Sequence, residues 1–340
     1  MSVTIKDIAR RVGVSIATVS MVINNKDSRI SESTRQKINE AVKEMNYHPN
    51  IAARSLMTSE TKTVGLIIPD VSNPFFADFA KNLESRLSQY QYSLFLCNSN
   101  NSMQKEENYL LELINRNIDA LVISSVNIEK LSETKLFRQV KIPILLFDRE
   151  LDSSNISTIS IDNCHGGYLA AQELVRNRHT DICCVSGSLQ LNNIRARFEG
   201  FRRYLEESGL SFDNASLFEG GLTVEHGYDS AKKIAEIRKT KSCTAVFCTN
   251  DLIAVGVYKA FREEGIRIPE DVSVIGFDDI EFAGYLSPPL TTIAQPVREL
   301  GNRSADIVVR LISDNRLSKP LCLPVKLVRR ESVAEGKTAP

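Results

Sequence analysis

Short apolar segments alternate with amphipathic segments from residue 64 to residue 278, and this alternation constrains the fold more than any other feature. The apolar segments have the length of strands, and the segments between them have the spacing of helices with one buried face. Strands that alternate with helices form a parallel sheet with helices on both faces. In chain order the apolar segments are VGLIIPD, YSLFLCN, DALVIS, IPILLFD, TISIDN, ICCVSG, SLFEG, TAVFCTN and VSVIGFD.

The alternation falls into two blocks of about 100 residues each, which predicts an α/β core of two doubly wound parallel-sheet lobes. The chain of 340 residues is long enough for these lobes and a further small unit. We expect the first lobe at 63–163 with a C-terminal return at 294–322, and the second lobe at 164–293 with 323–332. The chain would then cross between the lobes three times, near 163, 293 and 322.

The first 48 residues follow another pattern, that of three short helices. Thr4 with Asp7 three residues later has the form of a capping box, and Gly13 supplies the end of that helix. Ser15 and Ser31 can cap the second and third helices. A helix, a tight glycine turn and a second short helix form the helix-turn-helix geometry, whose second helix enters the DNA major groove. A three-helix module for protein interaction would show the same pattern, so that alternative stays open here.

Charge is unevenly distributed along the chain, although its 42 basic and 42 acidic residues balance. Residues 1–60 contain nine basic and six acidic residues, a net charge of +3, so the remainder carries −3. A basic end on an acidic body agrees with one polyanion-binding end. The zero total argues against a protein that coats nucleic acid along its whole length.

Cysteine usage and hydropathy indicate the compartment. The seven cysteines lie mostly in apolar segments and no CxxC motif occurs, so we expect reduced thiols and no disulfides. The N-terminus lacks the apolar stretch of a secretion signal, and no run reaches the roughly 18 apolar residues that span a bilayer. We therefore expect a cytoplasmic protein without membrane contact.

Motifs of catalysis are absent from the sequence. It contains no GxSxG, GxxxxGK[ST], GxGxxG or HExxH motif and no His/Cys cluster with metal-ligand spacing, and its four histidines are scattered. We expect no enzymatic activity, no cofactor and no metal.

Several motifs together resemble the LacI/GalR (lactose-repressor/galactose-repressor) family of bacterial transcription regulators. They are TIKDIARRVGVSIATVSMVINN, YHPN…ARSL, PDVSNPFFA, RFEGF, FCTNDLIAVGV, VSVIGFDD and PPLTTIAQP, which extend over nearly the whole chain. The resemblance implies a DNA-binding domain at 1–48, a hinge helix and linker at 49–62, and a periplasmic-binding-protein-like core that binds an effector. It implies a nucleoid-associated homodimer that binds double-stranded operator DNA, most often as a repressor.

The resemblance also assigns residues to the DNA interface. It places Ile16, Ala17 and Met21 at base edges. In the hinge helix, Leu56 would wedge into the minor groove at the operator centre and kink the duplex. Met21 stands where many relatives carry Arg or His, so we expect an apolar contact at that base pair, for example with a thymine methyl. The other implied DNA-contacting residues, mainly at phosphates, are Thr4, Ser15, Thr18, Ser20, Asn24, Asn50, Ala53 and Arg54.

Ligands of doubly wound sheets bind beyond the carboxyl ends of the strands, where this sequence carries carboxylates, amides and arginine. Such groups beside an aromatic ring suit a polyhydroxylated molecule, so we expect a sugar or a sugar derivative. With the resemblance, the expected effector contacts are Phe75 or Phe76, Asp148, Asn193, Arg197, Asn250 and Asp278. Structural alternatives stay open for three polar residues in these loops: Asp162 as a helix cap, Asn250 as a loop support and Asp279 as a turn residue.

Two departures from the family pattern bear on the effector. Leu191 stands where purine-sensing members have an arginine, and Leu222 where they have an aromatic residue, which disfavours a purine. No leucine heptad follows LVRRES, so we expect a dimer without a tetramerising tail. Two other functions stay open: a catabolite-control-type regulator driven by a protein co-regulator, and a non-regulatory cytosolic sugar-binding protein.

Overall fold

The computed structural model describes residues 3–23, 30–47, 60–149, 156–240, 242–314 and 316–336. The predicted DNA contacts Asn24, Asn50, Ala53, Arg54 and Leu56 lie outside these ranges. The chain divides into two compact units, Met1–Thr61 and Lys62–Pro340. Each unit is treated on its own below.

The described residues of the first unit include three helices, α1 (Ile5–Val12), α2 (Ile16–Ile23) and α3 (Glu32–Glu44). The predicted capping box is confirmed, because the side chains of Thr4 and Asp7 each bind the backbone N–H of the other. Gly13 ends α1 in the left-handed conformation, at φ 75°, where a side chain would be strained.

The caps predicted for the other two helices are also confirmed. The Ser15 hydroxyl oxygen accepts from the Thr18 backbone N–H at 3.0 Å, and that of Ser31 accepts from Thr34 at 3.3 Å. The three helices bury one small apolar core, which includes Ile8, Val19 and Ile38 at 0% exposure. The face of α2 opposite Val19 is therefore left at the surface.

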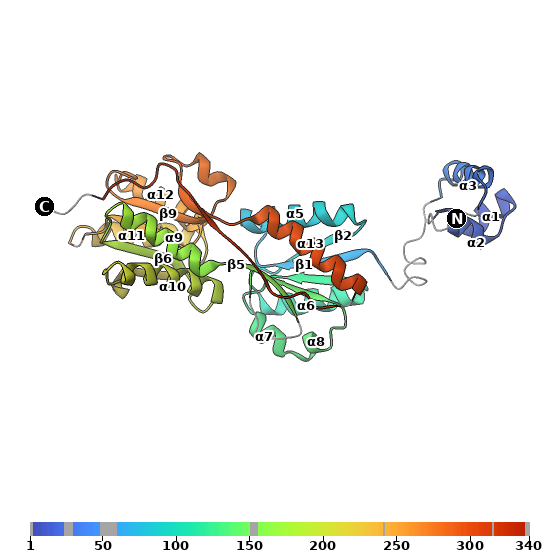
Figure 1. Ribbon diagram of the computed structural model, residues 1–340, viewed down its shortest axis with the longest axis horizontal. Helices are drawn as coiled ribbons and strands as arrows, with labels where there is room; N and C mark the ends of the chain where they lie inside the picture. The colour runs from blue at the N-terminus through green and yellow to red at the C-terminus, as the bar shows by residue number, and fades with distance from the viewer. Residues whose placement is uncertain are drawn as a thin grey trace. The chain divides into compact units, whose positions relative to one another are not determined.

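The second unit contains two six-stranded sheets, which form its two lobes (Figure 1). The strand order is β11-β5-β4-β3-β1-β2 in the first lobe and β12-β10-β9-β8-β6-β7 in the second. All pairs are parallel except β10 with β12. The strands are β1 (Thr63–Ile68), β2 (Ser93–Asn98), β3 (Ala120–Ile123), β4 (Ile144–Phe147), β5 (Ser157–Ile161), β6 (Ile182–Gly187), β7 (Leu217–Gly220), β8 (Ala245–Cys248), β9 (Ser273–Asp278), β10 (Thr291–Ala294), β11 (Leu321–Leu323) and β12 (Lys326–Val328).

Helices pack in pairs against these sheets, as Figure 1 shows for α5 beside α13 and for α9 beside α10. The pair α11 and α12 packs on the second lobe in the same way. The helices of this unit are α5 (Pro74–Gln89), α6 (Met103–Asn115), α7 (Ile128–Glu133), α8 (Lys135–Arg138), α9 (Asn163–Arg176), α10 (Asn192–Glu207), α11 (Val224–Ile237), α12 (Asp251–Glu263) and α13 (Val297–Asp314), with 3-10 turns η1 (Asn214–Ser216) and η2 (Glu281–Tyr285).

The chain passes between the two sheets three times, after β5, after β10 and after β11. Two expected lobe boundaries differ from the strands by one residue. Ala294 pairs with Asp278 in the second-lobe sheet, and Leu323 pairs with Ile161 in the first-lobe sheet. Backbone hydrogen bonding to the neighbouring strand extends each strand one residue beyond the sequence-based boundary.

Glycine permits the close approach of α9 and α10, on which the effector region depends. A Cβ on Gly167 would clash with the backbone carbonyl of Arg197, and one on Gly200 would clash with that of Cys164. Small residues at these two positions let the helix backbones touch. This contact fixes α10, whose first turns carry Asn193 and Arg197.

All seven cysteines are free in the structure. Among the residues described, no helix is long and apolar enough to cross a bilayer.

Candidate functional site

The exposed face of α2 carries the residues predicted to contact DNA. Ile16 is 45% exposed and Met21 is 40% exposed, whereas Val19 and Val22 are buried in the core of the first unit. Ala17 lies on the same exposed face. A helix normally turns its large apolar side chains inward, so the exposure of Ile16 and Met21 leaves two apolar groups available to a partner.

Polar and basic groups surround this face. The hydroxyls of Ser15 and Thr18 form a hydrogen bond of 2.8 Å at the start of α2. The Thr4 hydroxyl donates to the Asp7 carboxylate at 2.6 Å at the start of α1. These groups therefore also stabilise the helix ends. On α1, the side chains of Arg10 and Arg11 are 83% and 65% exposed. Their charges extend from the protein surface, as phosphate contacts require.

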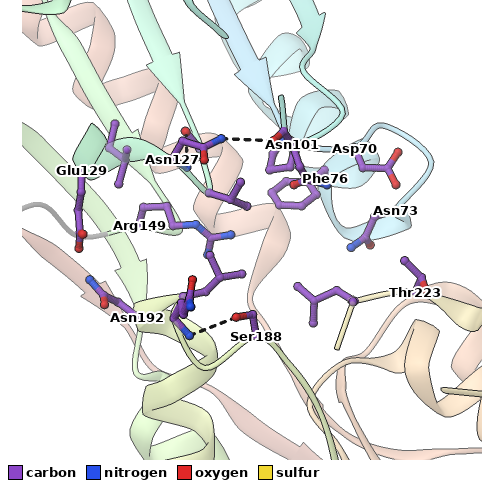
Figure 2. Close-up of a pocket in the computed structure, with 18 of the residues that line it drawn as sticks. Asp70, Asn73, Phe76, Asn101, Asn127, Glu129, Arg149, Ser188, Asn192 and Thr223 are labelled. Carbon is purple, nitrogen blue, oxygen red and sulfur yellow. Dashed lines mark hydrogen bonds between the residues drawn. The ribbon is translucent and has the colours of Figure 1, made fainter. Parts of the chain in front are cut away.

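A cavity of about 460 Å³ lies between the two lobes of the second unit (Figure 2). Its walls come from loops at the carboxyl ends of the strands, where parallel-sheet proteins bind ligands. The polar lining includes Asp70, Asn73, Asn101, Ser125, Asn127, Glu129, Lys130, Arg149, Ser188, Gln190, Asn192 and Thr223. The apolar and glycine lining includes Pro69, Phe76, Val126, Ile128, Leu191, Gly220, Gly221 and Leu222.

Of the residues predicted to touch the effector, Phe76 lines this cavity. Phe75 instead lies in the core, with its ring stacked on that of Phe147 at 5.8 Å. The cavity lining thus includes Phe76 and not Phe75, and contact of Phe76 with an effector stays a prediction. The helix pitch explains the outcome, because neighbouring positions on α5 point about 100° apart.

The five predicted polar residues are buried behind the cavity wall, and Asp148, Asn193, Arg197 and Asp278 belong to a buried network of hydrogen bonds and charges. Asn193 donates to the Asp148 carboxylate at 3.1 Å. Arg197 donates to the Thr249 carbonyl at 2.7 Å and to the Asp278 carboxylate at 3.4 Å. These groups are at most 8% exposed, and hydrogen bonds satisfy most of their polar atoms, but Asp148 Oδ1 is buried without a partner. Their direct contact with an effector stays a prediction.

Arg197 is the centre of this network. Its Nε donates to the Asn163 side-chain oxygen at 2.9 Å, and its guanidinium lies 3.8 Å from the centroid of the Phe277 ring. Gln295 donates to the same Asp278 carboxylate at 2.6 Å. Because Asn163 and Gln295 lie beside the crossings between the lobes, Arg197 connects the second lobe to the connecting segments.

Burial raises the pKa of three acids in this part of the structure, Asp278, Asp251 and Glu106. It raises the pKa of Asp278 to about 6, although the charge of Arg197 and the amide of Gln295 lower it in part. Burial and the neighbouring Asp278 charge raise the pKa of Asp251 well above its usual value. Burial likewise raises the pKa of Glu106, whose carboxylate accepts from Ser125 at 2.6 Å behind the cavity wall.

The structural alternatives are confirmed for two residues. Asp162 caps α9 by accepting from the His165 backbone N–H at 2.8 Å. Asn250 caps α12 and donates to the Leu222 carbonyl at 3.3 Å, so it supports a loop of the cavity while being 1% exposed. Asp279 has a positive φ of 57° but is more than a turn residue, since it also pairs with Arg330 at 2.7 Å.

Sequence reasoning missed the cavity residues that follow β3 and β7, among them Ser125, Asn127 and Thr223. The rule that ligands bind at the carboxyl ends of parallel strands applies to both loops and would have found them. Leu191 and Leu222, the two departures from the purine-sensing pattern, do line the cavity.

Comparisons with known proteins agree with this geometry. Residues 4–50 match the family described as bacterial regulatory proteins, lacI family, and residues 171–333 match a periplasmic binding protein-like domain. The HTH-type transcriptional repressor PurR of Aliivibrio fischeri (strain MJ11) is 36% identical over 311 residues, which are 92% of each chain.

Solved structures show the same architecture. The lac repressor dimer bound to operator and the anti-inducer ONPF superposes with a TM-score of 0.87 at 27% identity, covering 98% of this chain and all of that one. A LacI family transcriptional regulator from Enterococcus faecalis V583 with bound ribose gives a TM-score of 0.72 at 35% identity, covering 81% of this chain and 100% of the other.

Proposed function

Because this chain belongs to the LacI family of bacterial regulatory proteins, we propose that it represses transcription at one operator class under the control of a sugar-like effector. The operator is double-stranded DNA in the bacterial cytoplasm, so the protein acts at the nucleoid. The relatives are transcriptional repressors, and we propose no catalytic role for this chain.

The face of α2 carries the DNA-binding part of the proposal. Ile16, Ala17 and Met21 form an exposed row that can approach base edges in the major groove, which is wide enough for a helix. Ser15, Thr18 and Ser20 supply hydroxyls for phosphates on its flanks, with Thr4 at the start of α1. Asn24, Asn50, Ala53, Arg54 and Leu56 complete the proposed interface from the sequence alone.

A homodimer fits the surface of the first lobe. β2 is an edge strand that exposes Phe95 by 44% and Leu96 by 41%. An exposed apolar edge strand would pair or aggregate unless another surface covers it. A second copy can cover it, and two-fold symmetry then presents two α2 helices to the two halves of an operator.

The cavity supports a sugar-sized effector. Its volume of about 460 Å³ lies in the range of small-molecule sites, and the relative from Enterococcus faecalis holds ribose. We propose that Phe76 contacts the effector directly, and that Asp148, Asn193, Arg197, Asn250 and Asp278 respond to it through the buried network. The effector acts by binding one arrangement of the lobes better than another.

Selection of bound duplexes from a random pool tests the proposal. The full chain should enrich one two-fold symmetric sequence, and the retained fraction should fall steeply with salt because phosphate contacts release counterions. A screen of sugars and nucleosides should then find a sugar that changes retention. If no duplex sequence is enriched in a salt-sensitive manner, the DNA-binding role is contradicted. A response only to a phosphorylated protein partner would replace the sugar by the co-regulator alternative.

A further inference from the structure

Among the described residues that line the cavity, Arg149 is the one buried side chain with a positive charge. It follows Asp148, the first residue after β4, and is only 6% exposed. Figure 2 shows its guanidinium extending into the middle of the cavity, on the side of Asn192. An arginine keeps its charge in a protein, so this site holds a fixed cation.

Asp148 occupies one side of this guanidinium, and among the described residues Nε on the other side has no partner. Nη1 donates to the backbone carbonyl and to the carboxylate of Asp148, each at 3.1 Å. Nε is buried without a hydrogen-bond partner, and Nη2 makes no hydrogen bond to a residue that the structure describes. The Nε–Nη2 edge carries two parallel N–H groups, which match the two oxygens of a carboxylate or a phosphate, and Nε is the buried donor of this edge without a partner.

The N-terminus of α10 meets the same part of the cavity. Gln190, Leu191 and Asn192 line the cavity at the start of this 16-residue helix. Leu191 occupies the N-cap position without a side-chain cap, and the Ile194 N–H donates to the Asn193 side-chain oxygen at 3.0 Å, which leaves the N–H groups of Asn192 and Asn193 for a ligand. The first N–H groups of a helix have no intrahelical partner, and together with the helix dipole they favour an anion.

The acidic groups near Arg149 leave this edge free. Asp148 takes the opposite edge and also accepts from Asn193 at 3.1 Å. Glu106 is bound by Ser125 at 2.6 Å and lies at 0% exposure behind the wall. Asp70 accepts from Ser72 at 2.7 Å, and the remaining lining charges, Glu129 and Lys130, are exposed at the rim.

We infer that the effector is an acidic sugar derivative, whose carboxylate or phosphate binds between the Nε–Nη2 edge of Arg149 and the N-terminus of α10. The inference rests on the proposed effector site and specifies its ligand class. The sugar ring would then extend toward Phe76, whose face lies across the cavity in Figure 2. A neutral sugar would leave the buried Nε donor of Arg149 to a hydroxyl, which is a weaker partner than an oxyanion.

Matched pairs of neutral and acidic sugars test the inference on the full chain. The probes are ribose with ribose 5-phosphate, and glucose with glucose 6-phosphate and glucuronate. Thermal shift and calorimetric titration should show at least about tenfold tighter binding of an acidic member than of its neutral partner, as one charge-assisted bidentate contact can supply. Comparison of the sugar phosphates with glucuronate identifies whether the site binds a phosphate or a carboxylate. Inorganic phosphate alone should compete weakly.

Variants of Arg149 assign the effect to its guanidinium. R149Q removes the charge and the fork, so the preference for the acidic member should disappear. R149K keeps the charge but loses the fork, so it should retain only part of the preference. R202Q is the matched control, because Arg202 lies on α10 outside the cavity lining, with a side chain 50% exposed and paired with Glu206. R202Q should bind all probes like the parent chain.

The outcomes separate this inference from the proposed function. Equal or tighter binding of the neutral members overturns the inference, as does an acidic preference that survives in R149Q, or a panel without any acidic binder. In the first case a neutral sugar that changes operator retention still supports the proposed function. Loss of the cooperative thermal transition would show that R149Q is unfolded, and R149K then serves as the test variant. Full retention of the preference for the acidic sugar in R149K would overturn the bidentate contact of the Arg149 guanidinium.

Discussion

Replacing Arg197 with methionine removes the central cation of the buried network while keeping a long apolar side chain. The guanidinium is 3% exposed and binds the Asn163 side-chain oxygen, the Thr249 carbonyl and the Asp278 carboxylate. All three oxygens lose a donor in the variant. The Asp278 carboxylate, buried and with one remaining donor from Gln295, is left without a positive partner.

The magnitude depends on pH. Removing one partner of a buried ion pair costs about 3–5 kcal/mol, so we expect a loss of that order in the free energy of unfolding at pH 8. The pKa of Asp278 is raised to about 6 from a usual value of 3.8, so its contribution to stability is present at low pH and is lost as pH rises through about 6. Without Arg197 that pKa rises further. At pH 5 the carboxyl is protonated, and about 1–3 kcal/mol should remain from unsatisfied acceptors.

Urea unfolding followed by tyrosine fluorescence measures these losses, since only Tyr47 of the nine tyrosines precedes residue 62. R197M should therefore show a deficit about 2 kcal/mol larger at pH 8 than at pH 5. Adding D278N should recover part of the loss at pH 8. The control R202M removes an exposed pair with Glu206 and should cost less than about 0.5 kcal/mol. Equal deficits at both pH values would refute an uncompensated Asp278 charge.

Two further predictions concern α10 and α2. G200A should destabilise the second unit by about 1–3 kcal/mol in the same urea assay, because its Cβ would clash with the Cys164 carbonyl and separate α9 from α10. G284A is the matched control, since its Cβ would meet only Arg330 Nε at 3.9 Å, and an equal loss in both variants would contradict the packing argument. M21R should shift one position of each selected operator half-site toward guanine, with discrimination of about 1–3 kcal/mol, because arginine binds guanine through two hydrogen bonds. If M21R selects the same sequence as the parent chain, Met21 does not contact a base edge.

Local sequence signals determined the helices of the first unit. The capping pair Thr4 and Asp7, the turn at Gly13 and the caps Ser15 and Ser31 act within three residues of the bonds they make, so the sequence contains the whole interaction. The alternation of apolar and amphipathic segments determined the two parallel sheets for the same reason. Strand periodicity and helix periodicity are properties of a short stretch of chain.

Tertiary structure decided which polar groups meet the effector. Arg149 and Arg197 both follow strands in the sequence, Arg149 shortly after β4 and Arg197 on the helix after β6. Arg149 nevertheless lines the cavity, whereas Arg197 is enclosed among Asn163, Thr249 and Asp278. The difference arises from contacts between residues far apart in the chain, above all the close approach of α9 and α10 at Gly167 and Gly200. The sequence by itself therefore determined the elements and the edge at which a ligand binds. The direction of each side chain at that edge depends on how two lobes and three crossings pack together.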